Sequence, residues 1–309
     1  MEGRLTDIKS INEHIPLNED LEVFLYQETG LEISNIERSY SPSPISETIK
    51  VHTKLYGNTI FKFNLREFSN EIHFYKLVNN QIDIIPNLFK IIDSKSYTLT
   101  IIKRENGANG EDLFTDFPQS KRFILECIET IKIFYKKTDS LKEHFKLLPS
   151  LTQKNIYFQD QLLEIDNILK EYFPECLSHG DFLPYNIIQS NPTKLLDFQL
   201  ISKGYVIEDL YQFYSFLTQN NIITSHTEAK EYWLEVIRVF KMDLSLTTLF
   251  LLLEKTRKKN TIKLFSHFLE IQEKKIINKK NQHNYPVFFQ HSDIDLINMT
   301  YSMLEKKEN

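Results

Sequence analysis

Residues 177–188 read LSHGDFLPYNII, and a short distance further along the chain residues 196–198 read LDF. Short apolar pairs, at 187–188 and 195–196, flank a polar turn, which is the pattern of a small β-hairpin. The stretch lies between segments of helical periodicity and concentrates ionisable and amide side chains. We therefore expect a loop followed by a hairpin that together carry the chemistry of the chain.

The polar side chains of this stretch suit the transfer of a phosphoryl group from a nucleotide to a hydroxyl. That reaction needs a carboxylate that accepts the hydroxyl proton, oxygen ligands for Mg²⁺, and a cation on the α- and β-phosphates. Asp181 and Asn186 are five residues apart in a tight loop and can point into one pocket, Asp181 towards the hydroxyl as the catalytic residue and Asn186 towards the metal. Asp197 supplies the main metal carboxylate, and His179 is expected to support the loop rather than to react.

The pattern HGDxxxxN followed by LDF resembles the catalytic core of the aminoglycoside phosphotransferase and choline kinase family, which has the protein-kinase-like fold. The match includes Pro184, the apolar pair after Asn186, and Asp209 in a Glu-Asp-Leu triplet that opens a helix downstream. HxDxxxxN alone is moderately specific, and the correctly spaced LDF makes the match strong. The resemblance implies that Asp209 helps to support the catalytic loop. It also implies a small-molecule kinase that uses Mg²⁺, with ATP or GTP as the donor and a hydroxyl as the acceptor.

The N-terminal part of the chain offers a cation for the phosphates. Lys62 lies in IFKF at 60–63, within an expected strand and between apolar neighbours, where a lysine is costly unless it has a partner. The resemblance implies that this lysine contacts the nucleotide phosphates and pairs with a glutamate on the next helix. Glu71 is the expected partner and Glu67 the second candidate. The alternative is that Lys62 lies on an exposed strand face with its ammonium group in water.

Two further segments belong to the expected nucleotide site. The loop SPSPIS at 41–46 has no glycine, so if it covers the phosphates it must use the hydroxyls of Ser43 and Ser46 and backbone N–H groups. Its prolines remove two of those donors. Ile102 lies in the segment 101–105, where the family's hinge binds the adenine through backbone groups, and the resemblance gives only this location.

The order of periodicities predicts an α+β fold with two lobes. A first helix ends at Gly30, and an antiparallel sheet with one inserted helix, which carries Glu67, Phe68 and Glu71, follows. Its strands are expected near 33–40, 46–54, 59–64, 88–93 and 97–103. After the linker at 106–110 the pattern is helical, with helices expected near 118–138, 155–172, 206–219, 226–240, 244–258, 260–278 and 292–306. We therefore place the nucleotide-binding N-lobe at residues 1–105, and the C-lobe with the catalytic loop and acceptor site at 106–309.

Composition excludes several classes of protein. The chain has 309 residues, 41% of them apolar, as in an ordinary globular protein. Its seven glycines include no dinucleotide fingerprint and no P-loop, and its two cysteines exclude a disulfide framework or a cysteine-based zinc site. The longest charge-free apolar stretch, at 244–253, is too short to span a bilayer, and the N-terminus has no apolar region of a signal peptide. We therefore expect a cytoplasmic protein without a membrane partner.

Protein kinases share HxDxxxxN and have to be excluded on other grounds. About ten residues separate Asp197 from the helix that Glu208 opens, and the chain contains no Ala-Pro-Glu triplet, which ends the activation segment needed for a protein substrate. The acceptor is thus expected to be a small molecule, either an aminoglycoside-like antibiotic, in which case the protein confers resistance, or a choline, amino-acid or sugar metabolite. A catalytically silent kinase-like binding protein is the alternative from another class: the glycine-free loop favours it, and the intact Asp181, Asn186 and Asp197 oppose it.

One stretch of the chain is basic although the net charge of the whole chain is −5. Residues 251–285 carry nine Lys or Arg and three Glu, which can mean a nucleic-acid-binding face or the solvated surface of helices. Apolar residues recur there at three- and four-residue steps, so we expect two helices with lysines in water and no nucleic-acid partner. Cys176 and Trp233 are expected to be core residues; the alternatives are a nucleophile for Cys176 and a wall of the substrate cleft for Trp233.

Overall fold

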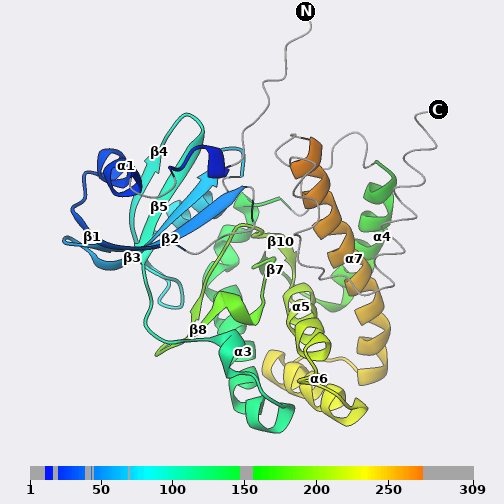
Figure 1. Cartoon of the computed structure of the whole chain (residues 1–309). Helices are drawn as coiled ribbons and strands as arrows, with labels where there is room; N and C mark the ends of the chain where they lie inside the picture. Colours follow the sequence, from blue (N-terminus) through cyan, green and yellow to red (C-terminus); the bar gives the residue numbers. More distant parts are fainter. Residues whose placement is uncertain are drawn as a thin grey trace, which may run out of the picture.

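The chain folds into two lobes, a sheet and a helical part (Figure 1). The structure is a computed structural model that describes residues 11–16, 20–38, 43, 45–68, 70–146 and 156–273. The N-terminal lobe holds an antiparallel five-stranded sheet in the order β1-β2-β3-β5-β4. Its strands are β1 (Ile33–Arg38), β2 (Ser46–Thr53), β3 (Gly57–Leu65), β4 (Leu88–Asp93) and β5 (Tyr97–Lys103). The predicted two-lobed α+β fold is confirmed.

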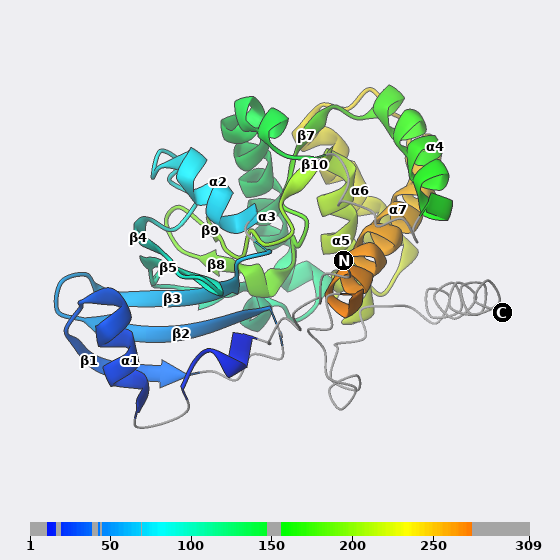
Figure 2. The same ribbon diagram turned by 90° about the horizontal axis from the view of Figure 1, so that it is seen from above.

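Two helices accompany the sheet and bury different faces. Helix α1 (Asp20–Thr29) follows the short 3-10 helix η1 (Ile11–Glu13) and ends at Gly30, whose φ of +70° is left-handed. Its buried leucines belong to the same core cluster as Ile49 and Phe61 of the sheet. Helix α2 (Asn70–Val78) lies between the sheet and the helical lobe (Figure 2), where Phe74 packs in the core of that lobe. Because α2 begins at Asn70, the expectation that Glu67 and Phe68 lie on this helix is wrong.

The C-terminal lobe consists of helices around two small sheets. Strand β7 (Glu175–Ser178) pairs with β10 (Ser202–Tyr205), and β8 (Ile187–Gln189) pairs with β6 (Ala108–Asn109) and β9 (Lys194–Leu195). The longer helices are α3 (Phe117–Thr138), α4 (Ile156–Tyr172), α5 (Val206–Gln219), α6 (His226–Phe240) and α7 (Leu246–Glu273), with 3-10 helices η2 (Gly110–Leu113), η3 (Asp139–His144) and η5 (Pro184–Asn186). Caps fix their starts: Asp116 accepts from the Gln119 N–H of α3, and Ser225 and Glu228 form a capping box on α6.

Helix α7 differs from the sequence expectation. It is one helix of 28 residues, where two helices with a break near residue 259 were predicted. Asn260 stands at the expected break, and its side-chain amide donates to the Glu208 carbonyl oxygen at 3.0 Å, so it does not compete with the backbone bonds of its own helix. The helix expected at 292–306 lies outside the described residues.

The basic stretch is also not the fully solvated face that its pattern predicts. Lys259 is entirely buried and the Lys263 side chain is 14% exposed, so the expectation that these lysines point to water is wrong. Lys274 and the lysines that follow it lie outside the described residues. Cys176 and Trp233 are buried in the core, as predicted. Among the described residues, no helix combines the length and the apolar character that crossing a bilayer requires.

Candidate active site

The loop between β7 and η5 brings Asp181 and Asn186 side by side. Pro184 begins the short helix η5, which turns the chain back so that the Asn186 amide Nδ2 donates to the Asp181 carboxylate at 2.8 Å and to the Asp181 carbonyl oxygen at 2.9 Å. The amide nitrogen of Asn186 is thereby directed at Asp181, which leaves the amide oxygen as the atom that could bind a metal. The side chains of Asp181 and Asn186 are therefore in direct contact.

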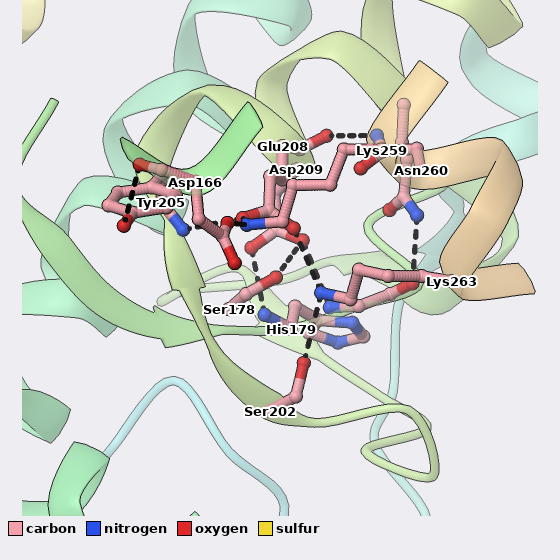
Figure 3. A network of polar contacts seen from close by, with 12 residues as sticks. Asp166, Ser178, His179, Ser202, Tyr205, Glu208, Asp209, Lys259, Asn260 and Lys263 are labelled. Carbon is pink, nitrogen blue, oxygen red and sulfur yellow. Dashed lines mark hydrogen bonds and ion pairs between the residues drawn. The ribbon is translucent and has the colours of Figure 1, made fainter. Parts of the chain in front are cut away.

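Asp209, in the first turn of α5, holds the start of this loop (Figure 3). Its carboxylate accepts four hydrogen bonds of 2.8–2.9 Å, from the Ser178 hydroxyl, the backbone N–H groups of His179 and Gly180, and the Tyr135 hydroxyl. Four donors of this kind match the acceptor capacity of a buried carboxylate. The structure therefore places Asp209 where it can support the catalytic loop.

Gly180 allows a close approach that another residue could not make. Its φ is +80°, and a Cβ atom would lie 2.1 Å from the carbonyl oxygen of Leu200. Gln212 of α5 clamps the same turn, because its amide donates to the Gly180 carbonyl oxygen at 2.8 Å and accepts from the Phe182 N–H at 3.2 Å. Gln212 is a loop contact that the sequence pattern did not indicate.

The side chain of His179 packs in the core next to the loop. The side chain is buried, its ring centroid is 4.9 Å from that of Phe198, and its Nδ1 accepts the Asp181 backbone N–H at 3.3 Å. Burial lowers the pKa of His179, which favours the neutral imidazole that this hydrogen bond requires. The geometry suits a supporting residue.

Lys62 of β3 joins the two lobes. Its ammonium lies 2.7 Å from Glu71 Oε2 of α2 and 2.8 Å from Asp197 Oδ1, and the side chains of Lys62 and Glu71 are 7% and 1% exposed. Burial disfavours the ammonium, but the carboxylates of Asp197 and Glu71 outweigh burial and raise the pKa of Lys62. The alternative of an exposed lysine is therefore wrong, and Glu71 rather than Glu67 is its partner.

A ring of side chains around Glu71 fixes the segment that carries Asp197. Glu71 Oε1 accepts the Phe198 N–H at 3.2 Å, and Asn64 of β3 donates to Glu71 Oε2 at 3.4 Å while its own oxygen accepts from Gln199 at 2.8 Å. Asp197 itself has φ +59°, a left-handed conformation in which non-glycine residues are uncommon. Sequence reasoning missed Asn64 and Gln199. The available signal was that Asn64 follows Lys62 by two residues on the same face of a strand.

The charges of the two aspartates differ because their neighbours differ. Burial and the nearby Asp197 carboxylate raise the pKa of Asp181 to about 7. Burial also disfavours the charge of Asp197, but Lys62 outweighs it and holds the pKa of Asp197 below its usual value. Asp197 is therefore the charged partner and Asp181 the group that can gain or lose a proton near neutrality.

The oxygen atoms at the mouth of the site fit a magnesium ion. Lys62 and the Gln199 N–H both donate to Asp197 Oδ1, which leaves Oδ2 for a metal, and 38% of the Asp197 side chain is exposed. The amide oxygen of Asn186 is the second candidate. Carboxylate and amide oxygens are the ligand types that Mg²⁺ takes from proteins.

The remaining predicted nucleotide contacts are Ser43, Ser46 and Ile102. Ser46 pairs in register with Asn64, and the Ser43 hydroxyl lies 3.1 Å from the Ser46 hydroxyl and accepts the Ser46 N–H at 3.3 Å. The described part of this loop thus bonds within its own turn. Ile102 is buried in β5 between Ile60 and Leu88 on the neighbouring strands. The roles of these three residues stay predictions.

Comparisons with known proteins agree with this geometry. Residues 135–233, which include the catalytic loop and Asp209, match the model of a family described as the phosphotransferase enzyme family. A search of curated protein sequences found no match.

Solved structures share the fold at low sequence identity. Macrolide 2'-phosphotransferase type I aligns with a TM-score of 0.53 and 8% identity over 86% of this chain and 95% of its own. The gentamicin complex of APH(2")-IIa gives 0.50 and 15% over 84% and 92%, and the streptomycin–ATP complex of APH(2")-IIa gives 0.50 and 14% over 94% and 97%. The family match and this common fold confirm the resemblance to the aminoglycoside phosphotransferase and choline kinase family that the loop motif predicts.

Proposed function

We propose that this chain is a phosphotransferase that moves the γ-phosphoryl group of ATP or GTP to a hydroxyl of a small molecule, with Mg²⁺ as its metal. The observation that carries the proposal is the position of Lys62, whose ammonium touches both Glu71 and Asp197 although 135 residues separate it from Asp197. This contact puts a fixed cation beside a metal-binding carboxylate, which is the arrangement that phosphoryl transfer requires.

Each residue of the site has a defined task in this reaction. Lys62 holds the phosphates and is itself held by Glu71, while Asn186 and Asp197 bind the metal through the oxygen atoms described above. Mg²⁺, when bound, neutralises charge on the phosphates. Asp181 accepts the proton of the acceptor hydroxyl, and the Asn186 amide keeps its carboxylate oriented. His179 and Asp209 support the loop without touching substrate.

The nucleotide lies between the lobes in this proposal. Ser43 and Ser46 approach its phosphates from the loop before β2, and the backbone near Ile102 binds the base. The site works where ATP and GTP are available, so we place the protein in the cytoplasm.

The small-molecule acceptor is supported by the short connection after Asp197. Between Asp197 and α5 the chain has only the Phe198–Ile201 turn and the strand β10, which pairs with β7. This connection is too short to form the segment on which a protein substrate would lie. The structures that share the fold include enzymes named for macrolides and complexes with gentamicin and streptomycin. An aminoglycoside-like antibiotic with a free hydroxyl is accordingly our first choice of acceptor.

A transfer assay tests the proposal. The full chain is incubated with Mg²⁺ and either labelled ATP or labelled GTP, against a panel of aminoglycosides, macrolides, choline, ethanolamine, amino acids and sugars. Asp181→Asn, which keeps the shape of the side chain, is the matched control. Transfer to an antibiotic that the control lacks supports the proposal, and transfer to choline, an amino acid or a sugar would make it a metabolic kinase. Nucleotide binding without any transfer would overturn it in favour of a kinase-like binding protein.

A further inference from the structure

Four charged side chains lie buried where helices α4, α5 and α7 meet (Figure 3). This charge cluster comprises Asp166, Glu208, Lys259 and Lys263. Glu208 Oε1 accepts from Lys259 at 2.7 Å and Oε2 from Lys263 at 2.8 Å, and Asp166 forms an ion pair with Lys259. The two lysines are one helical turn apart on α7, so both oxygens of one carboxylate receive a donor from the same helix.

The cluster is largely buried, and its charges balance. Lys259 is 0% exposed, Glu208 2%, Asp166 4% and Lys263 14%, and two positive charges face two negative ones. The Lys259 ammonium also lies 4.4 Å from the centre of the Tyr205 ring. Burial opposes the charge of Glu208, but the two lysines hold its pKa at about 2. Glu208 is therefore ionised, and both oxygen atoms of its carboxylate accept hydrogen bonds.

Glu208 connects this cluster directly to the catalytic loop. It precedes Asp209, which binds the Ser178 hydroxyl and the N–H groups of His179 and Gly180. Glu208 also accepts the Tyr205 N–H at 2.8 Å, and Asn260 donates to the Glu208 carbonyl oxygen. The first turn of α5 is therefore held by the two lysines, by Tyr205 and by Asn260. A shift of α7 along α5 would therefore also displace Asp209 and the loop whose N–H groups Asp209 binds.

Stability alone does not account for such a cluster. Buried ion pairs cost desolvation, and well-packed apolar side chains of similar volume stabilise a fold as well or better. An apolar interface sets the register between two helices only through the shapes of its side chains, whereas lysines that each meet one oxygen of a single carboxylate add a directional constraint. The charge cluster specifies one position of α7 against the helix that carries Asp209.

We propose that Glu208, Lys259 and Lys263 are positioning residues that set the catalytic loop through Asp209. The effect on rate rests on the proposed function, whereas the effect on the loop does not. Because α4 and α7 belong to the lobe in which we place the acceptor site, the same contact links these two helices to the loop that carries Asp181.

Lys263→Met is the test variant, because this lysine is the least buried member and its loss is the least disruptive to folding. Lys258→Met, on the same helix and outside the cluster, is the matched control, and Lys263→Arg keeps a donor for Glu208. Hydrogen exchange of the full chain is measured for peptides covering 177–186. We expect exchange on the order of tenfold faster in Lys263→Met, and unchanged rates in the other two variants. Faster exchange confined to α7, with the loop unchanged, would overturn the proposal.

Kinetics give the second measurement. We expect Lys263→Met to lower kcat roughly tenfold while the KM for the nucleotide stays within about twofold, with recovery in Lys263→Arg. An equal loss of kcat in Lys263→Met and Lys258→Met would contradict a positioning role. If the melting temperature of Lys263→Met is too low for a folded chain at the assay temperature, Lys263→Arg decides the question. Loop exchange in Lys263→Arg as fast as in Lys263→Met would then contradict the role as well. If the unmodified chain transfers phosphate to no acceptor, the proposed function fails, and the exchange experiment still decides this inference.

Discussion

The side-chain amide of Gln199 donates a 2.8 Å hydrogen bond to the amide oxygen of Asn64, across 135 positions of sequence and from one lobe to the other. Asn64 is fully buried and donates in turn to Glu71, the partner of Lys62. The bond therefore belongs to the ring that fixes Asp197 beside Lys62. It links the two lobes next to Asp197, the carboxylate that we propose binds the metal.

We expect the Gln199–Asn64 pair to be energetically coupled. Gln199→Leu removes the donor, and Asn64→Leu also leaves Glu71 short of one partner, so the second change should lower the free energy of unfolding more, by about 1–3 kcal/mol. Denaturant unfolding of both single variants and the double variant measures the coupling, which should be about 0.5–1.5 kcal/mol. Strict additivity would show that the bond contributes nothing.

Asp197 and Asp181 should separate binding from transfer. Asp197→Ala should abolish the Mg²⁺-dependent part of nucleotide binding, because Asp197 holds the metal in both ground and transition states. Asp181→Ala should leave binding nearly intact and remove transfer, because Asp181 acts on the acceptor hydroxyl. Titration with a fluorescent nucleotide, with and without Mg²⁺, and the transfer assay measure the two effects. An equal loss of nucleotide affinity in both variants would contradict this division.

The raised pKa of Asp181 predicts a pH dependence of the reaction. Burial and the Asp197 carboxylate raise this pKa to about 7, so below that pH the carboxyl is protonated in the free enzyme and cannot accept the hydroxyl proton. The value of kcat/KM should fall about tenfold for each pH unit below 7 and level off above it. A rate profile between pH 5 and 9 at constant ionic strength checks this. A level profile down to pH 5 would remove Asp181 from the role of base.

Gly180 and Gly57 provide a matched pair of substitutions. Both have positive φ, but a Cβ on Gly57 would meet nothing within 4 Å, whereas one on Gly180 would meet the Leu200 backbone. Gly57→Ala should lower the free energy of unfolding only by the backbone strain, about 1–3 kcal/mol, and leave transfer intact. Gly180→Ala should cost more and abolish transfer, because the catalytic loop must move. Thermal unfolding and the transfer assay on the two variants distinguish strain from collision, and similar results for both would refute the close approach.

Local patterns were sufficient to predict the loop and most of the elements. The HGDxxxxN spacing places Asp181 beside Asn186 because a proline-initiated turn between them is a local structure. Lys62 could be singled out because a lysine between apolar strand residues needs a partner, and the family resemblance points to Glu71, nine positions further on. Both inferences use separations of fewer than ten residues.

Contacts between distant segments escaped the same reasoning. Nothing near Gln199 indicates that it meets Asn64, and Lys259 looks like any surface lysine until α4 and α5 are packed around it. From helical periodicity we expected the Lys259 ammonium to face solvent, whereas in the fold Asp166 and Glu208 are its buried partners. Such pairs depend on tertiary packing, which a single sequence does not encode in a local pattern.

Trp233 gives the chain a built-in optical probe of one lobe. It is the single tryptophan, it is 0% exposed on α6, and its ring centroid lies 4.9 Å from that of Tyr232 and 5.1 Å from that of Tyr214. The five-stranded sheet contains no tryptophan. Selectively excited indole emission therefore reports the melting of the helical lobe alone, and its midpoint, set against the loss of far-ultraviolet circular dichroism, reveals whether the sheet unfolds in the same cooperative step.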